Sequence, residues 1–163
     1  MDQMVLSILV DNSAGVLSRV AGMFSRRGYN IDSLTVGVTE NPAYSRMTIT
    51  VSGSDDVLVQ IKKQLAKLVD VKEIIELPKH ASVVKELILV KVEADITKRQ
   101  AVTALAGIYK AKIVDVTPTH MMLELTGNQE KLSTFLNLLQ DFKITELARS
   151  GITGLARGTA NLK

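Results

Sequence analysis

Hydrophobic and polar residues alternate near the start of the chain and then change to a helical spacing. The run Val5–Val10 is rich in β-branched residues, which indicates a strand, and Asp11–Gly15 is typical of a turn that leads into a helix. Apolar residues then recur every three or four positions as far as Gly28, which predicts a helix. Its apolar face comprises Val16, Leu17, Val20, Ala21 and Phe24.

The pattern continues with two strands, a second helix and a last strand. Residues 29–39 and the alternating run 47–51 predict strands, and Gly53–Asp56 is typical of a helix start with acids in its first turn. Residues 71–77 predict a further strand. The order of these elements is βαββαβ.

The second half repeats this order after a linker at residues 78–82. The predicted elements are a strand at 87–92, a helix capped by Thr97, strands at 113–116 and 121–125, a helix capped by Asn128 and a strand at 142–147. The repeat predicts an α+β protein of two tandem ferredoxin-like (βαββαβ) sandwiches, each a four-stranded antiparallel sheet with two helices on one face. The expected domains are residues 1–78 and residues 84–163, and the latter ends in an irregular tail from residue 148.

Composition removes most catalytic and metal-binding chemistry. The 163 residues include no cysteine, no tryptophan and only two histidines, His80 and His120, which we expect at the surface. The net charge of +3 comes from the second half, where basic residues are spread out, so a solvated surface is favoured over a nucleic-acid interface. No apolar run reaches the ~18 residues of a membrane span, and the start resembles no targeting segment. We therefore expect a cytoplasmic protein with no metal site.

The segment that joins the first strand to the first helix carries the clearest functional signal. Free N–H groups at the start of a helix, together with its dipole, favour a bound carboxylate. Gly15 lets a ligand approach the backbone, and Asn12 offers an amide oxygen to an ammonium group and an amide N–H to a carboxylate. These groups match the two charged ends of a free amino acid. A capped turn without a ligand explains the same residues equally well.

Three separated segments, residues 9–34, Ser45–Ile49 and Ala148–Gly151, carry a family resemblance. In order and spacing they resemble the small regulatory subunits of acetohydroxyacid (acetolactate) synthase, a family with ACT domains. The resemblance implies an N-terminal ACT domain and a C-terminal ACT-like domain. It also implies a chain with no catalytic residues and no cofactor of its own, because thiamine diphosphate, Mg²⁺ and FAD belong to the catalytic large subunit.

The resemblance further implies how the chain works. It would activate the large subunit and inhibit it when valine or another branched-chain amino acid accumulates. Two chains would form a homodimer through their ACT domains, and the effector would lie between them. The implied effector-binding residues are Asn12, Ala14, Gly15, Val16 and Leu17 of one chain with Asn30 and Ile31 of the other.

Other interpretations stay open. The chain could be a free-standing ACT-domain amino-acid sensor that acts on another enzyme or on transcription, or a nucleic-acid binder through its basic second half. Ser45–Arg46 could contact the large subunit or begin a strand, and Arg149 and Arg157 could dock on the large subunit. The run Gly151–Gly154 matches the G-x-x-G of an RNA-binding KH loop but lies in the expected tail.

Overall fold

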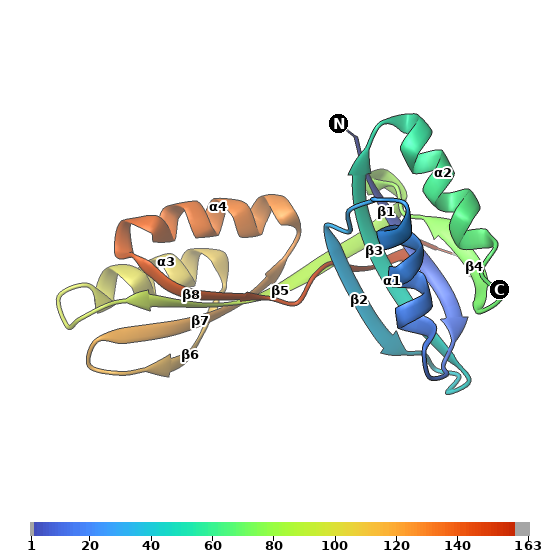
Figure 1. The fold of residues 1–163 in the computed structure, drawn as a ribbon. Coiled ribbons are helices and arrows are strands. Elements are labelled where there is room, and N and C mark those ends of the chain that lie inside the picture. The colour runs from blue at the N-terminus through green and yellow to red at the C-terminus, as the bar shows by residue number, and fades with distance from the viewer. Residues whose placement is uncertain (1, 159–163) are drawn as a thin grey trace. The chain divides into compact units, whose positions relative to one another are not determined.

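The chain divides into two compact units, which are described separately. The computed structural model describes residues 2–158. Unit 1 comprises residues 2–84 together with 152–158, and unit 2 comprises Lys85–Gly151 (Figure 1). These boundaries differ from the expected ranges 1–78 and 84–163, because residues 152–158 return to unit 1.

Unit 1 has the predicted βαββαβ order. Its elements are β1 (Asp2–Asp11), α1 (Val16–Arg26), β2 (Ser33–Val38), β3 (Tyr44–Gly53), α2 (Asp55–Ala66) and β4 (Val71–Glu76). The strands form an antiparallel sheet in the order β2-β3-β1-β4. Both helices cover one face of this sheet (Figure 1). The opposite face is called the helix-free face below.

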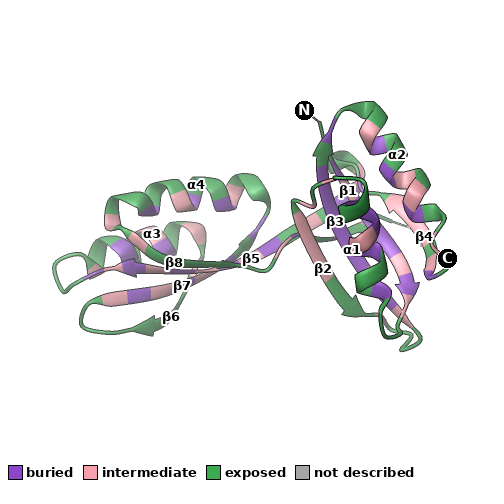
Figure 2. Cartoon of the chain, viewed as in Figure 1, coloured by how far each residue is buried: buried purple, intermediate pink, exposed green. Residues whose placement is uncertain are grey.

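Alternation along the strands builds the core of unit 1. Leu6, Ile8 and Val10 of β1 are fully buried and contribute to one hydrophobic cluster with the apolar face of α1. Burial of each such side chain stabilises the fold by about 1.5–3 kcal/mol relative to exposure. The buried positions follow one side of α1, whereas β3 is buried on both of its sides between Met47 and Val51 (Figure 2).

Two details of unit 1 differ from the sequence prediction. Strand β2 begins at Ser33, so residues 29–32 lie outside it. These residues follow α1, where Gly28 adopts a left-handed conformation (φ 68°) and the Tyr29 amide donates to the Phe24 carbonyl. The predicted linker contains a short 3₁₀ helix, η1 (Lys79–Ala81), and the next strand begins directly after it.

Unit 2 repeats the fold. It contains β5 (Ser82–Glu93), of which the first three residues belong to unit 1, followed by α3 (Arg99–Tyr109), β6 (Lys112–Val116), β7 (His120–Gly127), α4 (Gln129–Leu139), the 3₁₀ helix η2 (Gln140–Phe142) and β8 (Ile144–Arg149). The strand order is β6-β7-β5-β8, antiparallel throughout. The predicted fold class is confirmed in both units.

One of the two predicted helix caps in unit 2 is correct. The Asn128 side chain accepts a hydrogen bond from the Lys131 amide at 2.9 Å and caps α4. Thr97 does not cap α3, because its backbone N–H and its hydroxyl both donate to the Asp95 carboxylate and Lys98 occupies the cap position.

The expected irregular tail is wrong for residues 148–158, since these contain a strand that belongs to unit 1, and residues 159–163 lie outside the described residues. β9 (Thr153–Ala156) pairs with the start of β5. Just before it, Ile152 is 2% exposed, its amide donates to Ser33 Oγ at 2.7 Å, and its carbonyl accepts from Thr35 Oγ1 at 2.9 Å. A buried apolar side chain and two hydrogen bonds to β2 hold the segment in place.

We expect Gly154→Ala to destabilise unit 1. A Cβ at Gly154 would lie 2.9 Å from Val84 Cγ2 and 3.0 Å from the Val83 carbonyl oxygen, so the backbone of β9 must move away from β5. Overpacking of this kind costs about 1–3 kcal/mol. Chemical denaturation would measure the loss. Gly107→Ala is the control, because its Cβ meets nothing within 4 Å and a helical Ala stabilises by about 0.5–1 kcal/mol. Equal stabilities of the two variants would contradict the expected close packing.

Candidate functional site

The candidate site is built on the turn between β1 and α1. The turn is fixed to the β2–β3 connection by the Asn12 amide, which donates to the Ala43 carbonyl at 2.8 Å, and by Asn12 Nδ2, which donates to the Pro42 carbonyl at 2.9 Å. Gly15 then turns the chain into α1 with a left-handed conformation (φ 85°), which a residue with a side chain rarely adopts. The backbone of the turn is therefore held from both ends.

The first turn of α1 presents N–H groups with no capping partner. The cap residue Gly15 makes no side-chain hydrogen bond, and the first turn contains no acidic residue. The first N–H groups of a helix have no partner within the helix, and the dipole places partial positive charge there. Residues 12–15 are exposed, and Leu17 beside them is 46% exposed. The start of α1 can therefore accept an anion such as a carboxylate.

Arg19 places a full positive charge beside this turn, which the sequence reasoning missed. Its Nε and Nη2 donate to the two Asp70 carboxylate oxygens at 2.6 and 3.1 Å. The third nitrogen, Nη1, lies 2.8 Å from the position that a Cβ of Gly15 would occupy. Asp70 thus orients Arg19 so that one nitrogen lies next to the uncapped helix start. The four-residue spacing from Gly15 to Arg19 on a helix is the only sequence signal for this contact.

The ion pair between Arg19 and Asp70 shifts the pKa of both groups. The hydrogen bond from Arg19 lowers the pKa of the Asp70 carboxyl below its ordinary value, although desolvation opposes this shift. The same hydrogen bond raises the pKa of Arg19. Both groups therefore stay charged at neutral pH.

The other two predicted effector residues lie at the opposite end of α1. Asn30 and Ile31 follow the helix, whereas Asn12, Ala14 and Gly15 precede it, and eleven helical residues span about 16 Å. Asn30 Nδ2 donates to Asp32 Oδ1 at 3.0 Å, and Ile31 packs partly into the core. The predicted residues thus form two separate groups within one chain, and only a second chain can bring them together.

The side chains at the site have defined free atoms. Asn12 Nδ2 donates one of its two N–H groups to the Pro42 carbonyl, so its second N–H stays available to a carboxylate and Oδ1 stays available to an ammonium group. The helix N–H groups and Arg19 Nη1 are further donors for a carboxylate.

Arg27 and the Gly151–Gly154 segment have roles in the fold. Arg27 donates to the Met23 carbonyl and to Gln64, as expected for the end of a helix. Gly151–Gly154 precedes and enters β9 instead of joining two helices, so it is not a KH loop. Within residues 2–158 no cluster of three or more metal-binding side chains is found, and no helix is long and apolar enough to cross a membrane.

Comparison with known proteins identifies the class and then the family. A family model for the ACT domain of acetohydroxyacid synthase small subunits matches residues 6–73, so unit 1 is an ACT domain. A model for the small subunit of acetolactate synthase matches residues 85–158. The chain belongs to the family of acetolactate synthase small subunits.

Individual relatives agree with this assignment over nearly the whole chain. The isozyme 3 small subunit of Salmonella typhimurium is 50% identical over 155 residues, which cover 94% of this chain and 95% of the relative. A probable acetolactate synthase small subunit of Methanothermobacter thermautotrophicus is 46% identical over 162 residues, which cover 99% of this chain and 96% of the relative. The crystal structure of the Thermotoga maritima small subunit superimposes with a TM-score of 0.89 at 38% identity and covers 98% of this chain and 100% of that one.

We expect the contribution of Asp70 to stability to depend on pH. A carboxyl whose pKa is lowered by folding stabilises the fold above its unfolded-state pKa, and this contribution is lost as the pH falls through its folded-state pKa. Asp70→Asn should therefore lower the melting temperature at neutral pH, and the difference from the unchanged chain should shrink at about pH 3. The exposed Asp115→Asn serves as the control in the same thermal scans. A difference that is the same at both pH values would contradict the role of the ion pair.

Proposed function

We propose that this chain is the regulatory subunit of acetolactate synthase, which activates the catalytic large subunit and inhibits it when a branched-chain amino acid such as valine accumulates. The observation that carries the proposal is the uncapped start of α1 at Gly15 with Arg19 Nη1 beside it. This arrangement suits the carboxylate of a free amino acid, and Asn12 Oδ1 can accept from its ammonium group.

The catalytic chemistry belongs to the large subunit in this proposal. That subunit would hold thiamine diphosphate, Mg²⁺ and FAD, and the present chain would act through contact alone. Support comes from its relatives, which are named small subunits of acetolactate synthase and match it over almost their full length.

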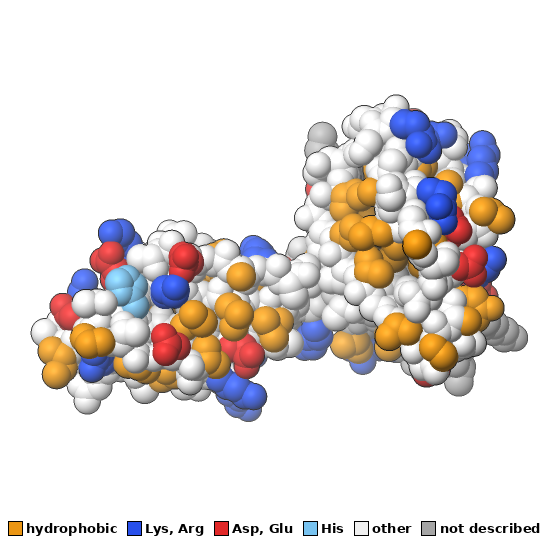
Figure 3. Space-filling model, turned by 60° about the horizontal axis from the view of Figure 1, so that its bottom comes forward, with side chains coloured by type: hydrophobic (Ala, Val, Ile, Leu, Met, Phe, Trp, Pro, Cys, Tyr) orange, Lys and Arg blue, Asp and Glu red, His pale blue; other side chains and the backbone are white. Residues whose placement is uncertain are grey.

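A homodimer would complete the effector site through strand β2. β2 is an edge strand, and Val36 and Val38 on it are 46% and 63% exposed. In the space-filling view, hydrophobic side chains are exposed among polar ones on unit 1 (Figure 3). Exposed apolar residues beside an unpaired edge favour pairing with a second copy.

Antiparallel pairing of two β2 strands would bring the two groups of predicted residues together. β2 runs parallel to β1, because both are antiparallel to β3. The start of β2, preceded by Asn30 and Ile31, lies at the end of the sheet away from the β1–α1 turn, and the end of β2 lies near that turn. A twofold axis through β2 would therefore bring Asn30 and Ile31 of one chain to the end of the partner's sheet that carries the β1–α1 turn.

The ligand side chain would then lie between Leu17 of one chain and Ile31 of the other. A single methylene changes binding in such a pocket by only ~1–3 kcal/mol, so discrimination among branched-chain amino acids would be modest. Effector binding can shift an equilibrium only by its different affinities for two states. A site shared by two chains provides this difference if the effector changes how the chains pack, with a coupling of typically ~1–3 kcal/mol.

We expect Gly15→Asp to abolish inhibition by valine while activation of the large subunit persists. The new carboxylate would lie where the ligand carboxylate binds, and like-charge repulsion of several kcal/mol weakens binding by about a hundredfold or more. Acetolactate formation by the reconstituted enzyme, with and without valine, measures both properties. Thr103→Asp, which adds the same charge at an exposed helical position of unit 2, is the control. Valine inhibition that survives Gly15→Asp would refute the site, and no rise in rate on mixing the unchanged chain with its large subunit would refute the proposed function.

We also expect Val38→Lys to weaken the dimer, because a charge would lie in the apolar edge that pairs across the twofold axis. Sedimentation velocity should show a shift from dimer to monomer, and valine sensitivity should fall with it. Val59→Lys, on α2 and 48% exposed, should leave the dimer intact. A Val38→Lys chain that stays dimeric would place the interface elsewhere.

A further inference from the structure

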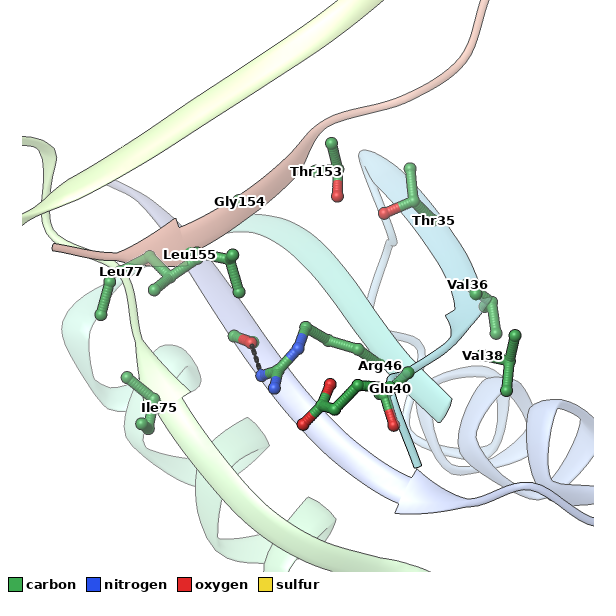
Figure 4. A pocket seen from close by; sticks show the side chains of 14 residues that line it. Thr35, Val36, Val38, Glu40, Arg46, Ile75, Leu77, Thr153, Gly154 and Leu155 are labelled. Atoms are coloured by element: carbon green, nitrogen blue, oxygen red, sulfur yellow. Dashed lines mark hydrogen bonds between the residues drawn. The ribbon is translucent and has the colours of Figure 1, made fainter. Parts of the chain in front are cut away.

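Unit 1 has a cavity of about 620 Å³ on its helix-free face, separate from the β1–α1 turn. Its walls are β2 with the turn after it on one side, the end of β4 on another, and β9 along the rim (Figure 4). None of the residues 12–17 lines it. A volume of this size lies within the range of small-molecule sites.

Side-chain alternation places Arg46 in this cavity. Its neighbour Met47 is 1% exposed in the core under the helices, so Arg46 points to the helix-free face. Directly across the ladder on β2 is Gly37, which has no side chain, and a Cβ built there would meet nothing within 4 Å. Gly37 therefore leaves the space beside Arg46 open.

The cavity contains two opposite charges, and no ion pair within 4 Å joins them in residues 2–158. Arg46 Nη1 donates to the neutral hydroxyl of Ser7 at 3.0 Å, and Arg46 is only half-buried. Glu40, in the turn after β2, extends its carboxylate toward the same space (Figure 4). Among residues 2–158, neither Arg46 nor Glu40 takes part in an ion pair. A guanidinium has five N–H donors, so most of those on Arg46 remain for a ligand.

Apolar side chains complete the lining. Ile75 comes from β4, Leu77 directly follows β4, and Leu155 comes from β9. A ligand that matches the guanidinium of Arg46, the carboxylate of Glu40 and the apolar lining carries a carboxylate, an ammonium group and an apolar body. A nucleotide or a phosphate fits less well, because Glu40 would repel its several negative charges.

We propose that this cavity is a second binding site for a free α-amino acid with an apolar side chain. Arg46 binds the carboxylate, Glu40 binds the ammonium group, and Ile75, Leu77 and Leu155 contact the side chain. The site lies within one chain and needs no dimer, unlike the effector site proposed at Gly15. Each chain therefore binds two amino acids.

Calorimetric titration with valine tests this proposal on the full chain. We expect two valines per chain for the unchanged protein, one for Gly15→Asp, one for Arg46→Gln and none for the double variant. In the Gly15→Asp background, Glu40→Gln should weaken the remaining site by about tenfold or more, since the ammonium group then meets a neutral amide oxygen instead of a carboxylate. In the same background, 2-oxoisovalerate, which lacks the ammonium group, and isobutylamine, which lacks the carboxylate, should each bind at least about tenfold more weakly than valine.

Matched variants separate binding from folding. Arg26→Gln removes a charge at an exposed position of α1 and should leave both sites unchanged. Gly37→Val fills the cavity while it keeps the Arg46–Ser7 hydrogen bond, so it should remove the second site without lowering the melting temperature.

The proposal is wrong if Gly15→Asp and Gly15→Asp/Arg46→Gln bind valine equally, or if 2-oxoisovalerate binds as well as valine. It is also wrong if Arg46→Gln abolishes activation of the large subunit but still binds two valines per chain, because Arg46 then contacts the large subunit and not an amino acid. None of these outcomes depends on whether valine inhibits the reconstituted enzyme.

Discussion

The left-handed backbone at Gly15 is the constraint on which the proposed effector site depends. It turns β1 into α1 with no side chain at the cap, so the first N–H groups of the helix stay open. The missing Cβ also leaves room for Arg19 Nη1, which the ion pair with Asp70 holds in place. A single residue type thus determines the path of the chain, the exposure of the helix dipole and the access to a neighbouring cation.

Local patterns predicted most of the elements correctly. The alternation in β1 and β3, the apolar face of α1 and the cap at Asn128 are encoded by residues a few positions apart, which is why the sequence is sufficient for them. The predicted cap at Thr97 does not form because Asp95, two residues earlier, accepts hydrogen bonds from both the hydroxyl and the amide of Thr97. The sequence predicts too early a start for β2 because residues 29–32 include apolar side chains and lead directly into the strand, where the Asp32 amide donates to the Thr50 carbonyl of β3.

Long-range contacts account for what the sequence could not predict. Asp70 meets Arg19 across 51 positions, and Thr35 meets Ile152 across 117 positions. Neither contact follows from spacing or propensity, because each depends on how the sheet brings distant strands together. The turn sequence and the family resemblance predict the other residues of the candidate site. The role of Arg19 follows only from its contacts in the structure, with Asp70 and beside Gly15. The cavity at Arg46 likewise requires β9. The sequence does not predict this strand, because the segment is short and contains Gly151 and Gly154.

The return of the chain to unit 1 has a consequence for biosynthesis. Unit 2 is inserted between two segments of unit 1, and the Ile152 contacts to Ser33 and Thr35 close loops of 119 and 117 positions. Chains emerge from the ribosome N-terminus first, and long loops are slow to close. The first unit to be synthesised is therefore the last to be completed. Until β9 has been synthesised, Thr48 and Thr50, both buried in the folded protein, lack the strand that packs against β3.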